Sequence, residues 1–196
     1  MGKKESVWKK IEHGAIAFTG HTMLTKYPPW VVYKPDIHRV RGKDVRSIIG
    51  VLEPGDILLR SFDGYLNTIF TPGFWGHGAI YLGSNEIGHA IGTGTCTEDI
   101  LDFCRCDAVA VLELEGADRE RIVTQARLLS SMHIGYDYDF MGTNDTYYCT
   151  EYVDISCDHA FNAVYKMIGG HRALTPDAIF NFYQIRKKLT INYEEK

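Results

Sequence analysis

Two short apolar runs, only two residues apart, place the strongest limit on the possible folds of this chain. HGAIYLG occupies 77–83 and EIGHAIG occupies 86–92, with Ser84 and Asn85 between them. Each run has the length of a strand, and Gly83 followed by two small polar residues favours a tight turn. The sequence therefore predicts a hairpin at this point and a sheet that is largely antiparallel.

Two further strand patterns flank the hairpin in the sequence. EPGDILLRSF at 53–62 places a turn before a continuous apolar run, and DAVAVLELE at 107–115 alternates Ala with Val and then Leu with Glu. Both patterns are typical of strands that bury one or both faces. We therefore expect four strands in this part of the chain.

Three helices are expected around these strands. Thr95 and Glu98 have the spacing of a capping box, which predicts a short helix through Phe103. Apolar residues recur at helical spacing within 117–133 and again within 149–168. The fold class that this order predicts is α+β, an antiparallel sheet with helices packed around it.

The length of the chain suits one main domain and a small extension. A chain of 196 residues can bury a single core. Residues 1–50 mix a short basic stretch with KYPPWVVYKPDIHRV, whose three prolines favour extended structure over helix. We expect residues 1–50 to form an N-terminal extension packed on the main domain, which spans 51–196.

Charge and hydropathy exclude several classes of protein. The formal net charge is -4 and 45% of the residues are hydrophobic, which argues against a disordered chain and against the basic stripe of a nucleic-acid-binding protein. No apolar run reaches the roughly 18 residues of a membrane-spanning helix, and the run at 14–18 is short for a signal peptide. We therefore expect a cytoplasmic protein with no nucleic-acid partner and no integral membrane segment.

The cysteines do not form the pattern of a disulfide framework or of a metal site. There are five, an odd number, and Cys104 and Cys106 are too close for an ordinary disulfide. No C-x-x-C pair offers two neighbouring metal ligands. We therefore expect reduced thiols, with Cys96, Cys104 and Cys106 as small buried side chains, and we expect no metal and no cofactor.

Two histidines lie in the predicted hairpin where strand pairing can bring them together. His77 stands between Gly76 and Gly78, which have no side chains to crowd its ring. His89 lies twelve residues later, in the neighbouring strand, where pairing can set the two rings side by side. A single histidine in a sheet is more often structural than catalytic, so it is the pair that indicates a site.

Cys149 opens the third predicted helix. Unpaired backbone N–H groups and the positive end of the helix dipole stabilise a thiolate there, which predicts a pKa below the usual value of about 8.5. A helix-start cysteine with a histidine base, itself oriented by a second polar group, is the arrangement of nucleophilic acyl chemistry. The alternative is that Cys149 packs in the core, as we expect for Cys157.

Taken in order, these motifs resemble a known family. WGHGAIYLG at 75–83 and YDYDFMGTNDTYYCTEYV at 136–153, together with PGDILL and LTPDAIFN, are similar to circularly permuted NlpC-type papain-like cysteine hydrolases, in particular the YiiX-like members. The resemblance covers about residues 54–182. It implies a papain-like α+β domain in which the histidine-bearing sheet precedes the cysteine-bearing helix.

The resemblance implies a role for each candidate catalytic residue. Cys149 is the nucleophile, His77 is the base that takes its proton, and His89 stands where the family places the polar residue that orients the base. Many YiiX-like sequences have a glutamate there, so a histidine departs from the commonest pattern. Glu86 is the alternative, but in a regular strand it points to the opposite face from His89.

The expected reaction is the hydrolysis of an amide bond. A thiolate that attacks a carbonyl carbon forms an acyl-enzyme, and the backbone N–H at the helix start can hold the oxyanion. The resemblance implies a cysteine peptidase or amidase that acts on a small peptide or another amino-acid-containing substrate, with a cell-wall peptide as one candidate. Trp75, Tyr148 and Glu151 are candidates for lining the cleft, and packing or helix capping is the alternative for each.

Two other functions stay open. The lecithin:retinol acyltransferase relatives share the permuted order and the His, His, Cys set, which makes a lipid acyl hydrolase or acyltransferase one alternative. No strongly amphipathic basic segment favours it. The second alternative is an inactive ligand-binding module that has kept the fold. Amide cleavage, ester cleavage and the absence of turnover separate the three functions.

Overall fold

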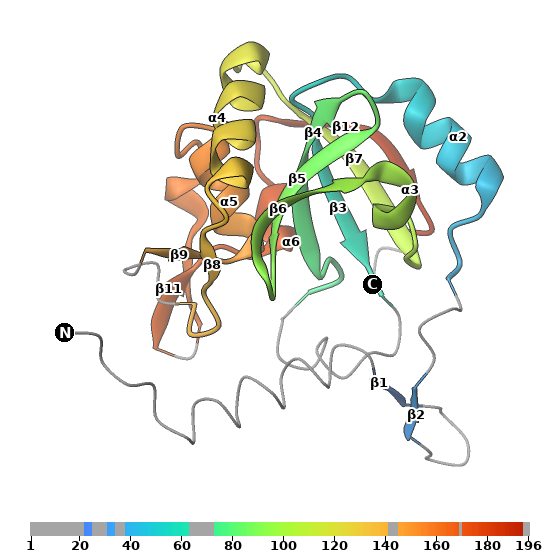
Figure 1. The fold of residues 1–196 in the computed structure, drawn as a ribbon, viewed down its shortest axis with the longest axis horizontal. Coiled ribbons are helices and arrows are strands. Elements are labelled where there is room, and N and C mark those ends of the chain that lie inside the picture. The colour runs from blue at the N-terminus through green and yellow to red at the C-terminus, as the bar shows by residue number, and fades with distance from the viewer. Residues whose placement is uncertain are drawn as a thin grey trace. The chain divides into compact units, whose positions relative to one another are not determined.

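A computed structural model describes residues 22–24, 31–33, 38–62, 73–140, 145–168 and 170–193. These residues belong to two compact units. One unit contains the antiparallel pair β1 (Thr22–Leu24) and β2 (Val31–Tyr33), and the other contains all remaining described residues (Figure 1). Of the predicted extension 1–50, residues 38–50 belong to this second unit, and the packing of the rest on the main domain stays a prediction.

The second unit is built on a six-stranded antiparallel sheet in the order β12-β7-β3-β4-β5-β6. Its strands are β3 (Ile57–Ser61), β4 (His77–Gly83), β5 (Glu86–Ile91), β6 (Gly94–Asp99), β7 (Ala108–Leu114) and β12 (Ile185–Ile191). The predicted hairpin is confirmed as β4 and β5, and its turn residues Ser84 and Asn85 have φ angles of 55° and 64°. The four predicted strands are all present, and the fold class is the α+β class that the sequence predicts.

Helices cover both faces of this sheet. One face carries α4 (Arg119–Ser131), α5 (Cys149–Ser156) and α6 (Pro176–Phe180), and the other carries α2 (Gly42–Val51) and α3 (Ile100–Phe103) (Figure 1). Residues along β3 alternate between the faces: Ile57 and Leu59 pack on the side of α4 and α5, and Leu58 packs on the side of α2 and α3. The sheet is therefore the middle layer of three.

Several elements of this unit have no counterpart in the sequence analysis, α2 and β12 among them. The helix α2 has Ile48 completely buried against the sheet, and the strand β12 adds an edge to β7. The helix that the sequence predicts within 117–133 is confirmed as α4.

The predicted capping box at Thr95 and Glu98 is wrong. Both residues lie in β6, and α3 begins only after Asp99, whose carboxylate accepts a hydrogen bond from the Leu101 N–H at 2.7 Å. The Thr95 hydroxyl instead donates to the carbonyl of Leu129 at 2.7 Å. Pairing with β5 therefore outweighs the local capping pattern.

The helix that begins at Cys149 is shorter than predicted. It covers 149–156, whereas the sequence predicts a helix over 149–168. Asp158 and His159 have φ angles of 58° and 60°. This left-handed conformation ends a helix, although both residues carry side chains that make it costly. The apolar pattern beyond this point reflects contacts of separate short elements with the core.

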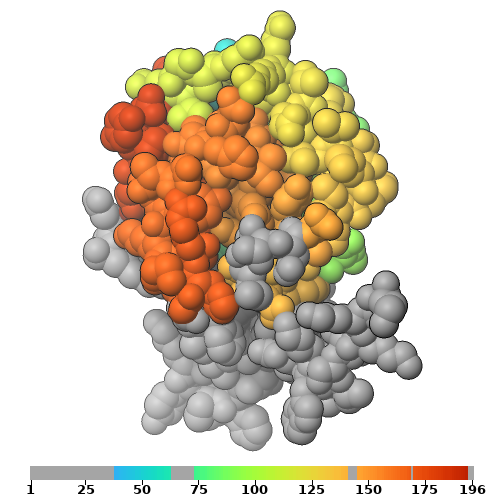
Figure 2. All heavy atoms as spheres, turned by 90° about the vertical axis from the view of Figure 1, so that its left-hand side faces the viewer, coloured from blue at the N-terminus to red at the C-terminus, as the bar shows by residue number. Residues whose placement is uncertain are grey.

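Two small strand pairs lie next to α5 along the chain. The parallel pair β8 (Gly135–Tyr136) and β9 (Thr146–Tyr147) precedes it, and the antiparallel pair β10 (Lys166–Ile168) and β11 (His171–Ala173) follows it. Figure 2 looks onto this side of the molecule, where α4 (yellow) lies beside the region from α5 to β11 (orange).

Candidate active site

The structure brings the two histidines of the hairpin together. His77 begins β4, His89 lies in β5, and His77 Nε2 is 3.1 Å from His89 Nδ1. Both rings face Phe103 of α3, at ring-centroid distances of 6.1 and 6.5 Å. His89 is completely buried, whereas His77 is partly exposed at the start of its strand.

Both histidines are held in the neutral form. Burial lowers the pKa of His77 well below its usual range, and the nearby charge of Arg60 acts in the same direction. Burial and the charge of Arg60 lower the pKa of His89 to about 3. A neutral imidazole has one N–H and one bare nitrogen, so one ring of the pair donates and the other accepts.

Cys149 is the first residue of α5, and it is 7% exposed. Burial raises the pKa of the Cys149 thiol, and this effect exceeds that of the backbone N–H groups of Gly78, Thr150 and Cys149, which face the sulfur and favour the thiolate. The expected lowering of this pKa is therefore wrong. At so closed a site, the lost solvation of the charge outweighs what the helix start supplies.

The start of α5 packs on β4 at Gly78, beside the sulfur. A Cβ at Gly78 would lie 3.4 Å from Val153 Cγ2 and 3.6 Å from Thr150 Cγ2. The Cys149 sulfur therefore lies beside the amide that follows His77. The hydrogen bonds of the described residues do not include one between Cys149 and His77. In sites without a substrate such contacts are often longer and tighten only in the complex.

A tyrosine that the sequence analysis does not name also faces the sulfur. Tyr136 of β8 has its hydroxyl within hydrogen-bonding reach of the Cys149 side chain. Burial, followed by the charge of a Cys149 thiolate, raises the pKa of this hydroxyl well above its usual range, so it stays protonated and can donate. The one sequence signal for it is its place in the tyrosine-rich segment YDYDF at 136–140.

The loop that leads into His77 is tied to α6. The two carboxylate oxygens of Asp177 accept hydrogen bonds from the N–H groups of Phe74 and Trp75, each at 3.0 Å. Gly73 has a φ of 127°, and a Cβ there would collide with the same carboxylate, so the position requires glycine. The α6 segment, which carries part of the family resemblance, thereby positions the start of β4.

Two of the three residues expected to line a cleft are buried. Trp75 and Tyr148 are each 1% exposed. Trp75 packs on Phe180 with ring centroids 5.3 Å apart, and the Tyr148 hydroxyl accepts a hydrogen bond from the Leu174 N–H at 3.1 Å. These contacts are those of core side chains.

Glu151 is the third of these residues, and it is partly exposed. Its carboxylate receives the Tyr148 N–H, while its Oε2 atom is buried with no hydrogen-bond partner among the described residues. Burial raises the pKa of Glu151 to about 7, and the charges of Asp137 and Asp154 act in the same direction. A cation brought to Oε2 would favour the ionised form.

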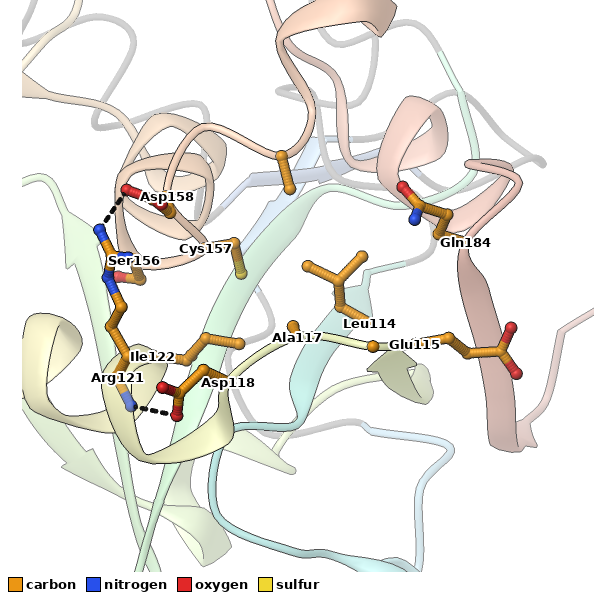
Figure 3. Close-up of a pocket in the computed structure, with 12 residues that line it drawn as sticks. Leu114, Glu115, Ala117, Asp118, Arg121, Ile122, Ser156, Cys157, Asp158 and Gln184 are labelled. Carbon is orange, nitrogen blue, oxygen red and sulfur yellow. Dashed lines mark hydrogen bonds and ion pairs between the residues drawn. The ribbon is translucent and has the colours of Figure 1, made fainter.

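A pocket of about 310 Å³ lies at a different place in the unit (Figure 3). It is lined by the end of β7, the start of α4, the end of α5 and Gln184. Cys157 lines it, whereas Cys149 is at the opposite end of α5, about 12 Å away at 1.5 Å per residue. This pocket is therefore separate from the paired histidines and Cys149.

Paired histidines on a sheet that precedes a helix-start cysteine form the arrangement expected of a permuted papain-like cysteine hydrolase. The comparison with known families agrees. Residues 51–184 match the family described as permuted papain-like amidase enzymes, YaeF/YiiX, C92 family, and the chain belongs to that family. The protein is accordingly an enzyme of the cysteine peptidase and amidase class.

A solved structure with the same fold is that of the metalloprotein YiiX from Escherichia coli O157:H7. The sequences are 15% identical, the TM-score is 0.56, and the match covers 74% of this chain and 98% of that chain. At this identity the likeness shows the fold alone. Comparison with curated protein sequences gives no match.

YiiX is described as a metalloprotein, and the described part of this chain has no group of three or more His, Cys, Asp or Glu side chains placed to hold a metal ion. All five cysteines are free. Cys104 and Cys106 are buried as predicted, and Cys96 is partly exposed. Within the described residues, no helix is both long and apolar enough to cross a membrane.

Proposed function

We propose that the chain hydrolyses an amide bond in a small peptide, with Cys149 as nucleophile, His77 as base and His89 as the residue that orients the base. The observations that carry this proposal are the 3.1 Å pairing of His77 with His89 and the Cys149 sulfur at the start of α5, which faces the N–H of Gly78, the residue after His77. The pairing occupies Nε2 of His77, so Nδ1 is the nitrogen that takes the proton of the thiol.

The reaction begins from a neutral thiol and a neutral imidazole. As the Cys149 sulfur bonds to the carbonyl carbon, its proton passes to His77 and the carbonyl oxygen becomes an oxyanion. The backbone N–H of Cys149 and the protonated hydroxyl of Tyr136 are the donors that stabilise this charge. His77 then gives the proton to the leaving amine, and water hydrolyses the acyl-enzyme.

Glu151 supports a substrate with a free amino group. Its Oε2 atom is buried with no hydrogen-bond partner in the part of the chain that the structure describes, and burial raises the pKa of the carboxyl to about 7. An ammonium group at Oε2 would both satisfy the oxygen and stabilise its charge. Short peptides with a free amino end, including fragments of bacterial cell walls, are therefore the proposed substrate class.

The test is a turnover assay of the full chain on short peptides, cell-wall peptide fragments and acyl esters, with each peptide also supplied in N-acetylated form. We expect amide cleavage that is faster for the free amino form. Cys149→Ala should lower the rate about 10⁴-fold or more, because it removes the nucleophile. Cys157→Ala is the matched control: it makes the same change at the far end of the same helix and should keep the rate.

Three results would contradict the proposal. If the Cys149→Ala enzyme cleaves at the parent rate, Cys149 is not the nucleophile. Cleavage of the acyl esters alone would favour the lipid acyl chemistry of the lecithin:retinol acyltransferase type. No turnover on the whole panel, with retained binding of one of its members, would favour the binding module.

A further inference from the structure

A buried nitrogen of His89 faces a carboxylate that the site described above does not use. His89 Nε2 has no hydrogen-bond partner among the described residues, and His89 is completely buried. Glu98 Oε2 lies 3.9 Å from this nitrogen. Glu98 is in β6, which pairs with β5, so this carboxylate lies on the strand next to His89, at a distance longer than a hydrogen bond.

Glu98 is held in this place by a buried arginine. Arg60 Nη1 is 3.5 Å from Glu98 Oε2 and donates to the carbonyl of Phe103 at 3.2 Å. The guanidinium also stacks over the ring of Phe103, 4.6 Å from its centroid. Burial raises the pKa of Glu98, and the charge of Arg60 opposes this, so the cation favours a carboxylate at this position.

The charged and titratable groups that face His89 therefore come from three neighbouring strands. They include Arg60 of β3, His77 of β4 and Glu98 of β6, and also Cys96 of β6, the register partner of His89. Of these, the carboxylate is the strong hydrogen-bond acceptor for the Nε2–H of His89, because a guanidinium has no acceptor, a thiol is a weak one and His77 is on the Nδ1 side.

We propose that Glu98 is a positioning residue that fixes the tautomer of His89. This inference rests on the proposed roles of His77 and His89. An ionised carboxylate has acceptors only, so the nitrogen that faces it carries the hydrogen. His89 is then protonated at Nε2 and has a bare Nδ1, which accepts the hydrogen bond of His77 Nε2–H.

The tautomer matters when His77 takes the proton of Cys149. The imidazolium of His77 donates from both nitrogens, so the nitrogen of His89 that faces it must be an acceptor. If His89 carried its proton on Nδ1, two N–H groups would point at each other and the imidazolium would lose its partner. Glu98 prevents this arrangement without contact with the substrate.

The experiment reads the tautomer directly, without a substrate. The full chain is labelled with ¹⁵N-histidine, long-range ¹H–¹⁵N spectra are recorded, and the signals of His89 are assigned by their loss in His89→Gln. We expect His89 to show a protonated Nε2 and a bare Nδ1. Glu98→Ala should shift His89 to a mixture with the Nδ1-protonated form, and Glu98→Gln, whose amide oxygen still accepts, should restore the parent pattern.

The control is Glu86→Ala, which removes a carboxylate from the same hairpin. Glu86 is half exposed and pairs with Arg127 at 3.6 Å, so its loss should leave the His89 signals unchanged. Melting curves of each variant separate a loss of fold from a change of tautomer. If Glu98→Ala unfolds, Glu98→Gln becomes the test, because the inference requires that this variant keeps the parent tautomer of His89.

Two results would overturn the inference: a parent enzyme with His89 protonated at Nδ1, or a folded Glu98→Ala variant with the parent tautomer. Neither result would contradict the role of Cys149 as nucleophile, which the turnover of Cys149→Ala tests separately. Conversely, a Cys149→Ala variant with full activity would remove the proposed function while the tautomer signals stay as expected. The two proposals therefore fail in distinguishable ways.

Discussion

At the scale of single residues, burial sets the protonation state of the candidate site. Burial raises the pKa of Cys149 and lowers the pKa of His77 well below its usual range. Three backbone N–H groups and the charge of Arg60 favour the thiolate, but they do not outweigh burial. The resting pair is therefore neutral, and the proton moves only as the sulfur attacks.

This resting state predicts a broad pH profile of kcat/KM for an N-acetylated peptide, which has no amino group to pair with the Glu151 carboxylate. The rate falls on the acid side when His77 gains a proton and can no longer act as a base. It falls on the alkaline side when Cys149 and His77 together lose the proton that is passed to the leaving amine. Since the pKa of His77 is lowered and that of Cys149 is raised, the plateau should include about pH 6.5 to about pH 8.5. Rates measured across the range from acid to alkaline pH check this expectation.

Alkylation by iodoacetamide gives a second measurement of the same state. The thiolate is the reactive form, so labelling of Cys149 should be slow at neutral pH and should rise above about pH 8.5. An acid limb of kcat/KM near pH 6.5, together with fast alkylation at neutral pH, would mean that the resting pair is an ion pair instead.

At the scale of elements, the close approach of the helices to the hairpin depends on glycine. A Cβ at Gly88 of β5 would lie 2.8 Å from Ser130 Oγ of α4 and would collide with the Tyr152 hydroxyl of α5. That hydroxyl donates to the Ala126 carbonyl at 2.7 Å, so it is not free to move away. The three elements therefore fit only if position 88 has no side chain.

Gly88→Ala should lower the free energy of unfolding by about 1–3 kcal/mol, the usual cost of overpacking a core. Gly50→Ala is the control, because a Cβ at Gly50 of α2 meets nothing within 4 Å, and alanine there should be neutral or stabilising. Urea unfolding of both variants measures the difference. Equal stability of the two would show that β5 shifts away from the helices at little cost.

At the scale of the whole described unit, a buried carboxylate joins segments that are far apart in the chain. Asp56, just before β3, is completely buried. Its oxygens lie 2.8 Å from Arg119 Nη2 of α4 and 2.8 Å from Lys188 Nζ of β12, and it accepts the Glu53 N–H at 2.8 Å. One side chain thereby ties the sheet edge, the central strand and a helix.

Asp56→Ala should lower the free energy of unfolding by roughly 2–3 kcal/mol, because it leaves the Glu53 N–H unpaired and removes the buried partner of two cations, which keep Glu53 and Glu113 as ion-pair partners. Arg121→Ala is the control. The ion pair of Arg121 with Asp158 is also 2.8 Å long, but both side chains are more than half exposed, so its loss should cost about 0–1 kcal/mol. If urea unfolding gave similar losses of unfolding free energy for the two variants, burial would not be the reason that Asp56 stabilises the fold.

Local patterns were sufficient to predict the hairpin and its histidines. The turn at Ser84 and Asn85 sets the register of β4 and β5, and that register places His77 next to His89. The start of α5 at Cys149 also follows from local sequence. These features depend on residues close together in the chain, where periodicity and turn chemistry act directly.

Other elements follow from contacts that the local sequence does not contain. Thr95 and Glu98 have the pattern of a helix start but lie in β6, because pairing with β5 satisfies their backbone. The apolar residues after α5 continue the helical period, yet Asp158 and His159 turn the chain away. At β6 a tertiary contact outweighs a weak local preference, and after α5 the left-handed backbone of two residues ends the helix.

The amino-acid sequence was enough to establish the fold class, the order of histidines before cysteine, and the family, because each depends on motifs and their spacing. The surroundings of those residues depend on the folded chain. Burial reverses the expected pKa shift of Cys149. The folded chain also encloses Trp75 and Tyr148 in the core and places Tyr136 next to the Cys149 sulfur. Desolvation and long-range approach are properties of packed segments, and no single segment of the chain carries them.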